Sequence, residues 1–522
     1  MSCSSSFVEN VAAKRLLTAP SVAQFKFAKS RVRLIHGLEV LPDTPGEDRH
    51  KSGGMLYWMM RDQRVQDNWA FLYAQRLALK FEVPLSVCFV LAPCYQADTL
   101  RHFSFMIDGL AEVEQECRSL NIPFYLINAI ATITREESSL GVSRRWSSDP
   151  SGKNSEQLFG GPQVAQGIKN LVKKLNIACI VTDFSPLRTQ LAWTENLLQT
   201  LPAHIPVCQI DAHNIVPVWC GSNKLEYTAR TIRPKLFEQT ARFLTEFPPV
   251  VSHPFSNTAV STLELTDWEA IKSDYWGDRN VCPVSWAIPG TTAGFGVLRS
   301  FIDERLKDFD SHRNNPDSPA LSCLSPWFHF GQLAPQRAIL EVSAVQKKYG
   351  RSADVFFEEA FNRRELADNY CFYNPHYDSF QGVREWAKDT LMKHAEDKRE
   401  VAYTKSQLEE AQTADDLWNA AQRQLLHEGK MHGFLRQYWA KKILEWCADG
   451  PEVAIDWAIY FNDRYSLDGT DPNGYVGIMW AICGVHDQGW PERKIFGKVR
   501  YMCYNGCKKW FSVPNFVSKY LK

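Results

Sequence analysis

The chain of 522 residues is too long for one ordinary domain, and its composition, 45% hydrophobic and 23% charged, is that of a globular protein. Lysine plus arginine balances aspartate plus glutamate at 59 each, which excludes a protein that is basic overall, so any nucleic-acid-binding surface must be local. No run of about 18 uncharged apolar residues occurs, and no membrane span is predicted. The 14 cysteines lack zinc spacing, so no metal site is expected.

The N-terminal segment is basic. Residues 1–38 contain six lysines and arginines and one acid, Glu9, with serines at positions 2, 4, 5 and 6. This composition is typical both of an organelle transit peptide and of a disordered basic arm. Residues 1–30 are predicted to be one or the other.

Residues 31–215 alternate short apolar runs with helical patterns. Strands are predicted at 55–60, 85–91, 122–127, 177–182 and 205–210, and helices at 66–80, 103–119, 163–175 and 188–200. Asp67 or Asn68 is the expected cap of the first helix. Continuous apolar strands that alternate with helices predict a doubly wound parallel sheet. Residues 134–162, rich in Ser, Gly and Arg, are predicted to be a surface loop or a mobile insertion.

The rest of the chain contains no further strand pattern. Residues 216–292 hold seven prolines with little periodicity, which indicates a long connector over the surface. Residues 293–522 form an all-α domain, with helices predicted at 294–309, 333–349, 353–373, 384–395, 406–427, 431–447 and 451–461. The predicted fold is therefore an α/β domain, a long linker and an all-α domain.

Several common catalytic signatures are absent. No GxGxxG follows a predicted strand, and no GxxxxGK[ST], HExxH or GxSxG occurs. The segment 290–296 has the wrong spacing for a dinucleotide site and is predicted to be a connector that enters a helix. The usual signatures of phosphotransfer, zinc proteolysis and hydrolysis are therefore missing.

Three stretches of the helical domain carry specific patterns. Ser322 and Ser325 come just before an apolar helix, where they are either ordinary caps or part of an anion site for a group such as a pyrophosphate. The helix at 430–446 places Trp439 and Trp446 on one face, about 10 Å apart along the axis, which favours a core stripe when taken alone.

The third stretch, residues 460–490, is the densest. It joins Asn462, Asp468, Asp471 and Asn473 through several glycines, which allow the backbone to approach a flat ligand closely. Asp468 is predicted to accept from a ring N–H or to pair with Arg436.

These motifs resemble those of class II cyclobutane pyrimidine dimer photolyases over nearly the whole chain. The match rests on residues 53–75, 321–333, 430–446 and 467–490, of which the last two are highly specific. The resemblance implies an N-terminal α/β domain, a long linker and a C-terminal helical domain that binds FAD, active as FADH⁻. That architecture agrees with the elements predicted from the residues.

The resemblance also implies roles for individual residues. The implied FAD-binding residues are Phe309 (where relatives often have Tyr), the phosphate-binding loop of Leu321, Ser322, Cys323, Leu324 and Ser325, the ion pair of Arg436 and Asp468, Asp471, and Asn462 facing flavin N5. Class I relatives give the role of facing flavin N5 to a different position, and Gly477 matches that position, emptied of its side chain. Trp439 and Trp418 resemble electron-transfer tryptophans, with Trp446 nearby. The implied lesion pocket consists of Glu359, Gln437 (Met in some relatives), Trp480 and Trp490.

A light-driven repair mechanism follows from the resemblance. The partner is DNA that contains a cyclobutane pyrimidine dimer, which is flipped out of the duplex at reduced cost because its bases pair poorly. Excited FADH⁻ donates an electron, the cyclobutane bonds break and the electron returns, while Glu359 stabilises the charged dimer. We expect a monomer in the nucleus, with mitochondrion or plastid as the alternative. A second, antenna chromophore is left open, because the α/β domain could hold a deazaflavin, a folate or neither.

Three other functions remain as alternatives. A cryptochrome-like photoreceptor would bind FAD without repair, and it often carries a long C-terminal extension, whereas only 32 residues follow Trp490 here. A photolyase for (6-4) photoproducts is disfavoured by the tryptophan spacing. A non-catalytic DNA- or flavin-binding scaffold would show no light-dependent repair.

Overall fold

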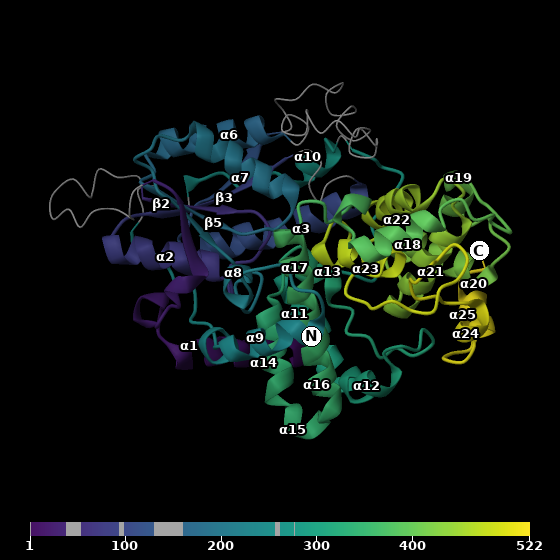
Figure 1. Cartoon of the computed structure of the whole chain (residues 1–522). Helices are drawn as coiled ribbons and strands as arrows, with labels where there is room; N and C mark the ends of the chain where they lie inside the picture. Colours follow the sequence, from purple (N-terminus) through teal and green to yellow (C-terminus); the bar gives the residue numbers. More distant parts are fainter. Residues whose placement is uncertain are drawn as a thin grey trace.

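The computed structural model describes residues 2–37, 54–92, 99–129, 160–255, 262–275 and 277–521. A part that contains the β-sheet and a helical part lie side by side (Figure 1). Most of the loop predicted at 134–162, namely residues 134–159, lies outside the described residues.

A six-stranded sheet forms the centre of the first part. Its strands are β1 (Val32–His36), β2 (Met55–Met59), β3 (Leu85–Leu91), β4 (Phe124–Asn128), β5 (Cys179–Asp183) and β6 (Val207–Ile210). The order is β1-β6-β5-β2-β3-β4, and every pairing is parallel except β1 with β6. The doubly wound sheet is confirmed, with one difference: the edge strand β1 is antiparallel. This strand was not predicted because it is only partly buried and lacks an apolar run.

Helices cover both faces of this sheet. The faces alternate along β2, so that Tyr57 packs with α2 (Trp69–Phe81) and α3 (Leu100–Ser119), whereas Trp58 packs with α6 (Gly161–Leu175) and α7 (Arg188–Thr200). In Figure 1, α6 and α7 lie above the sheet and α2 lies below it. Asn68 is the cap of α2, because its side chain accepts from the N–H groups of Ala70 and Phe71 at 3.0 and 3.2 Å.

The N-terminal segment is ordered. Residues Ser2–Thr18 form helix α1, which packs against α11 (Thr291–Ser300). Arg15 donates two hydrogen bonds of 2.8 Å to Asp67, which also accepts from Arg337. The expectation of a disordered arm is therefore wrong, and the targeting role stays a prediction.

The predicted linker contains helices as well as irregular chain. They are α8 (Val218–Gly221), α9 (Ala229–Phe243) and α10 (Trp268–Ser273). A capping box of Thr228 and Thr231 begins α9, and Pro234 lies inside this helix. Proline density therefore concealed a helix of 15 residues.

The C-terminal part is helical, as predicted, with several helices divided. Its longer helices are α11, α14 (Pro335–Ala344), α16 (Arg351–Phe357), α17 (Arg364–Tyr373), α18 (Glu385–Lys393), α20 (Asp416–Glu428), α21 (Gly433–Trp446), α22 (Pro451–Tyr465) and α23 (Pro472–Cys483). Its shorter ones are α12 (Phe309–His312), α13 (Ser325–His329), α15 (Gln346–Tyr349), α19 (Lys405–Glu409), α24 (Tyr504–Cys507) and α25 (Val513–Lys519). The pattern at 353–373 is interrupted by a π-helix, η8 (Glu358–Arg363). None of the helices in the described ranges is long and apolar enough to cross a membrane.

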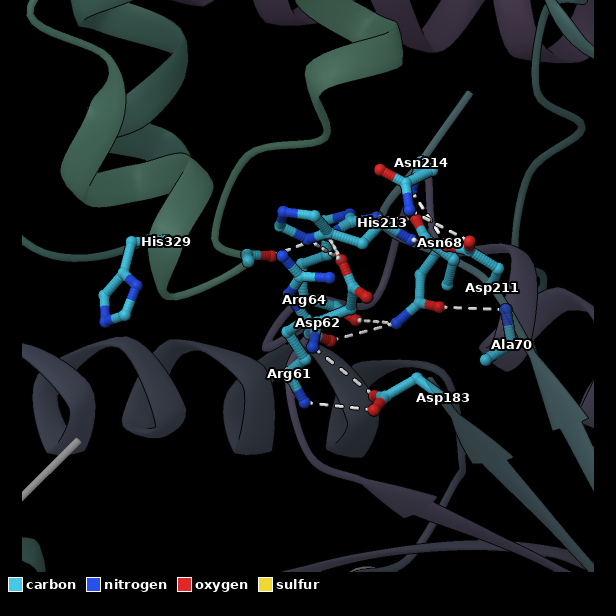
Figure 2. Close-up of polar contacts among 12 residues, drawn as sticks. Arg61, Asp62, Arg64, Asn68, Ala70, Asp183, Asp211, His213, Asn214 and His329 are labelled. Atoms are coloured by element: carbon cyan, nitrogen blue, oxygen red, sulfur yellow. Dashed lines mark hydrogen bonds and ion pairs between the residues drawn. The ribbon is translucent and has the colours of Figure 1, made fainter. Parts of the chain in front are cut away.

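A buried polar network closes the carboxyl end of the sheet, where β2 and β5 meet at the point at which the strand order reverses. Figure 2 shows Asp183, the last residue of β5, accepting from the backbone of Arg61, while His213 lies 3.2 Å from Asp62. The Arg61 side chain donates to Asp368 of α17 at 2.7 and 3.0 Å. The network thus joins the sheet to the helical part.

Candidate flavin site

A cavity of about 240 Å³ opens in the helical part. It is lined by His213, Phe309, Ser322, Ser325, Phe328, His329, Phe356, Glu359, Ala360, Arg364, Arg436, Asp468, Asp471, Asn473 and Gly474. Seven of these residues were predicted for the site: Phe309, Ser322, Ser325, Glu359, Arg436, Asp468 and Asp471. Segments far apart in the sequence therefore converge on one cavity.

A second cavity of about 40 Å³ adjoins the first and shares Arg436, Asn473 and Gly474 with it. Its wall also contains Trp439, Asn462 and Gly477. The predicted residues Asn462 and Trp439 therefore lie beside the main cavity, in the wall of the small one.

Arg436 of α21 links the two cavities. It donates to Asn462 Oδ1 at 3.2 Å, to Ser466 Oγ at 2.8 Å and to Asp468 Oδ1 at 2.9 Å. The ion pair with Asp468 that the sequence predicts is formed. These bonds fix the guanidinium plane, so the site holds a positive charge in one orientation.

Both aspartates of this wall are held ionised. Burial acts to raise the pKa of Asp468, but Arg436 and the hydroxyls of Ser466 and Ser325 outweigh it and hold the pKa at about 2. Asp471, the N-cap of α23, lies 3.1 Å from His329 Nδ1, and this contact helps to hold its pKa below the ordinary value despite burial.

The loop Leu321–Ser325 contributes its two serines to the cavity, while Leu324 is buried in the hydrophobic core. Cys323 adopts φ +58°, a left-handed conformation that is uncommon for a residue with a side chain. Its Sγ accepts from Lys430 Nζ at 2.8 Å. This turn presents Ser322 and Ser325 to the cavity and directs Cys323 away from it, toward Lys430.

Glu359 reaches the cavity from the π-helix η8 (Glu358–Arg363). Such bulges often occur at functional sites, because the extra residue redirects a side chain. The Glu359 side chain is 48% exposed, and desolvation of its carboxyl group at the cavity wall raises its pKa, although Arg363 and Arg313, the latter 3.9 Å away, act in the opposite direction. The carboxyl group therefore keeps its proton to a higher pH than a fully solvated glutamate.

The three predicted tryptophans form a connected series. Trp439, in the wall of the small cavity, accepts through its backbone carbonyl from Trp418 Nε1 at 3.1 Å. The Trp418 and Trp446 ring centroids are 5.5 Å apart, and Trp446 is 5.2 Å from the half-buried ring of Tyr403. The rings of Trp418, Trp446 and Tyr403 are therefore in contact in that order, and Trp418 is joined to Trp439 through the Trp439 backbone.

Three of the four predicted lesion residues lie outside both cavity walls. Trp480 is half-buried, with Arg363 5.5 Å from its ring, and Trp490 is 40% exposed beneath Arg500. Gln437 follows Arg436 on α21 and is half-buried. Glu359 alone joins this group to the main cavity.

The walls suit an anionic, planar ligand such as FAD. Arg364 is buried in the main cavity wall, and its Nη1 has no hydrogen-bond partner in the described chain. A buried cationic donor without a partner requires an acceptor. At Gly474 a Cβ would approach Asn462 Nδ2 to 2.8 Å, so the glycine leaves that amide its position beside the cavity.

Several lining residues were not predicted, among them His213, His329, Arg364 and Gly474. His213 could have been predicted, because it follows β6 and ligands of doubly wound sheets bind beyond the carboxyl ends of the strands. Arg364 stands in a charged stretch, Asn362–Glu365, where an arginine is ordinarily exposed, so no sequence pattern indicates its burial. No sequence pattern distinguishes His329 and Gly474 from ordinary residues of their helices.

Comparisons with known proteins identify the family. Residues 55–252 match the DNA photolyase family model. The chain is 52% identical over 514 residues to a deoxyribodipyrimidine photo-lyase of Potorous tridactylus, covering 98% of this chain and 88% of the relative.

Two solved structures share the fold at low sequence identity. They are a class III photolyase of Agrobacterium tumefaciens (TM-score 0.58, 17% identity) and a cryptochrome of Synechocystis (TM-score 0.60, 16% identity). Each match covers 90% of this chain and 86% of the other. The sequence match, extending over nearly the whole chain, shows that it belongs to the DNA photolyase family, as its class II-like motifs predict.

Proposed function

We propose that this protein is a class II deoxyribodipyrimidine photolyase that splits cyclobutane pyrimidine dimers in DNA with light. The observation that carries the proposal is the convergence of Arg436, Asp468 and Asn462 with Glu359 around adjoining cavities. The Potorous relative, 52% identical, is named for this reaction. The fold alone does not separate repair from photoreception, because a cryptochrome shares it.

Membership of the family and the fold imply a flavin chromophore, FAD. We propose that Ser322, Ser325 and Arg364 bind its phosphates and that Arg436, Asn462 and Asp468 surround its ring system. Reduced FAD supplies the electron for repair after it absorbs light. The fixed charge of Arg436 favours an anionic ring, and the ionised Asp468 holds that charge in place.

We propose that Glu359 binds the flipped dimer. Its pKa is raised, and in the protonated form the carboxyl donates a hydrogen bond to a pyrimidine carbonyl and stabilises negative charge as it develops there. Trp480 and Trp490 supply aromatic surface beyond the cavity for the unstacked bases, and Gln437 of α21 supplies a polar contact. Trp439, Trp418 and Trp446 carry electrons between the cavity and the surface.

We further propose a nuclear protein, with mitochondrion or plastid as the alternative, and an antenna, deazaflavin or folate, in the α/β part. Imaging of the tagged chain tests the localisation, and the absorption spectrum of the purified protein tests the antenna. Exclusion of the tagged chain from the nucleus contradicts the nuclear localisation, and a spectrum of FAD alone contradicts the antenna.

The proposed activity is tested by reducing the purified protein and illuminating it with an oligonucleotide that contains a thymine dimer. Light-dependent conversion to paired thymines supports the proposal. A flavin spectrum without repair would replace it with the photoreceptor function.

A further inference from the structure

The C-terminal segment is strongly basic although the chain as a whole is neutral. Residues 491–521 contain seven lysines and arginines and a single acid, Glu492. That acid is already engaged, because it accepts from Lys393 at 2.7 Å and lies 2.9 Å from His394 Nε2. The positive charge of the segment is therefore not neutralised within it.

The most exposed part of this segment is Lys508–Trp510, which follows α24. Both lysines are exposed, and neither forms an ion pair within the described part of the chain. Trp510 is 61% exposed, more than any other aromatic side chain among the large exposed hydrophobic residues. Lys508 Nζ lies 4.7 Å from the centroid of the Tyr504 ring, a contact that leaves its charge without a counter-ion. Two exposed lysines beside an exposed indole form a surface that suits a nucleic-acid strand, whose phosphates attract lysine and whose sugars and bases pack on aromatic rings.

Two contacts attach this surface to elements that also contribute to the flavin site. The Trp510 ring centroid lies 6.1 Å from that of Phe434, which is two residues before Arg436 on α21. Asp317, in the loop that leads to Ser322, accepts from the backbone of Ser512 at 3.1 Å and from Lys519 at 3.4 Å. The surface is therefore attached to two of the segments that form the cavity wall.

We propose that Lys508, Lys509 and Trp510 bind the DNA backbone that flanks the dimer, as a contact separate from the lesion pocket. This inference rests on the proposed function, since it assumes a DNA substrate. The contact does not depend on the DNA sequence or on the presence of a dimer, because these side chains bind backbone phosphates and not the lesion. It holds the duplex while the dimer enters the cavity.

The test is a salt series of binding constants for duplexes with and without a dimer, comparing the wild type with the double variant Lys508→Ala/Lys509→Ala. We expect the salt dependence, the slope of log K against log salt, to fall by about two, one per lysine, equally for both duplexes. An unaltered slope would overturn the proposal, and so would a loss confined to damaged DNA.

The chain provides a matched control in Lys347, Lys348 and Tyr349 of α15, a second lysine–lysine–aromatic triplet with both lysines exposed. Lys347→Ala/Lys348→Ala should keep the wild-type slope, and an equal fall in this control would overturn the assignment. Lys508→Arg/Lys509→Arg keeps both positive charges and should retain the wild-type slope. This result would show that the loss in the alanine variant comes from the missing charge and not from altered folding. Failure of the wild type to bind dimer-containing DNA would instead count against the proposed function.

Discussion

At the residue scale, the environment of Glu359 decides how it acts. Desolvation at the cavity wall raises the pKa of this carboxyl, so its proton is lost at a higher pH than that of a fully solvated glutamate. If the protonated form donates to the dimer, the repair yield is constant below the raised pKa and declines as pH rises through it. Glu359→Gln keeps a donor at every pH, so its yield should show no decline, whereas Glu359→Ala should be several-fold lower throughout.

These yields are measured per absorbed photon with prereduced enzyme over a pH series. The neighbouring Glu358→Gln is the control, because the negative charge of Glu358 helps to raise the pKa of Glu359. Its decline should remain but begin at lower pH. A wild-type profile identical to that of Glu359→Gln would show that the Glu359 proton plays no part.

The individual contacts also show what a sequence can predict. The pair of Arg436 and Asp468 could be predicted, because opposite charges occur in two family-specific motifs. The contact of His329 with Asp471 could not, because it joins helices 142 residues apart without a local pattern. Arg364 resembles an ordinary helical arginine until the cavity around it is known.

At the scale of elements, α20 and α21 place the tryptophan series. Trp439→Phe removes the ring nearest the small cavity, and it should block photoreduction of oxidised FAD while leaving repair by prereduced enzyme nearly intact. Absorbance during illumination with an external reductant measures the first, and dimer repair the second. Trp193→Phe, on α7 of the α/β part, should photoreduce normally. Normal photoreduction in Trp439→Phe would remove this tryptophan from the route.

Element boundaries were predicted where amphipathic periodicity was strong and missed where it was not. Helix α23 was not predicted, because its glycines and prolines are typical of turns, although the segment is buried against α21 and α22. The pattern at 406–427 divides into α19 and α20, since Asp415 caps a new helix by accepting from Trp418 N at 2.9 Å. The differences between the predicted and the observed helices therefore arise from tertiary packing and from capping geometry.

At the scale of the molecule, Arg61 and Asp368 join the sheet to the helical part through a buried, bidentate pair. Arg61→Ala leaves the Asp368 carboxylate buried without its partner and should lower the free energy of unfolding by about 3–5 kcal/mol. Arg188→Ala, which breaks a partly exposed pair with Asp378 between the same two parts, should cost only about 0–1 kcal/mol. Denaturant unfolding followed by flavin fluorescence measures both. Equal losses would contradict a special role for the buried pair.

Light-driven repair tests the central claim most directly. Prereduced protein is illuminated with duplexes that carry either one cyclobutane thymine dimer or one (6-4) photoproduct, beside dark samples, and the products are separated by chromatography. The structure and the family predict that the cyclobutane duplex alone is restored, and only in the light. Bound flavin and bound DNA with no restored thymines, or restoration of the (6-4) duplex instead, would contradict the account.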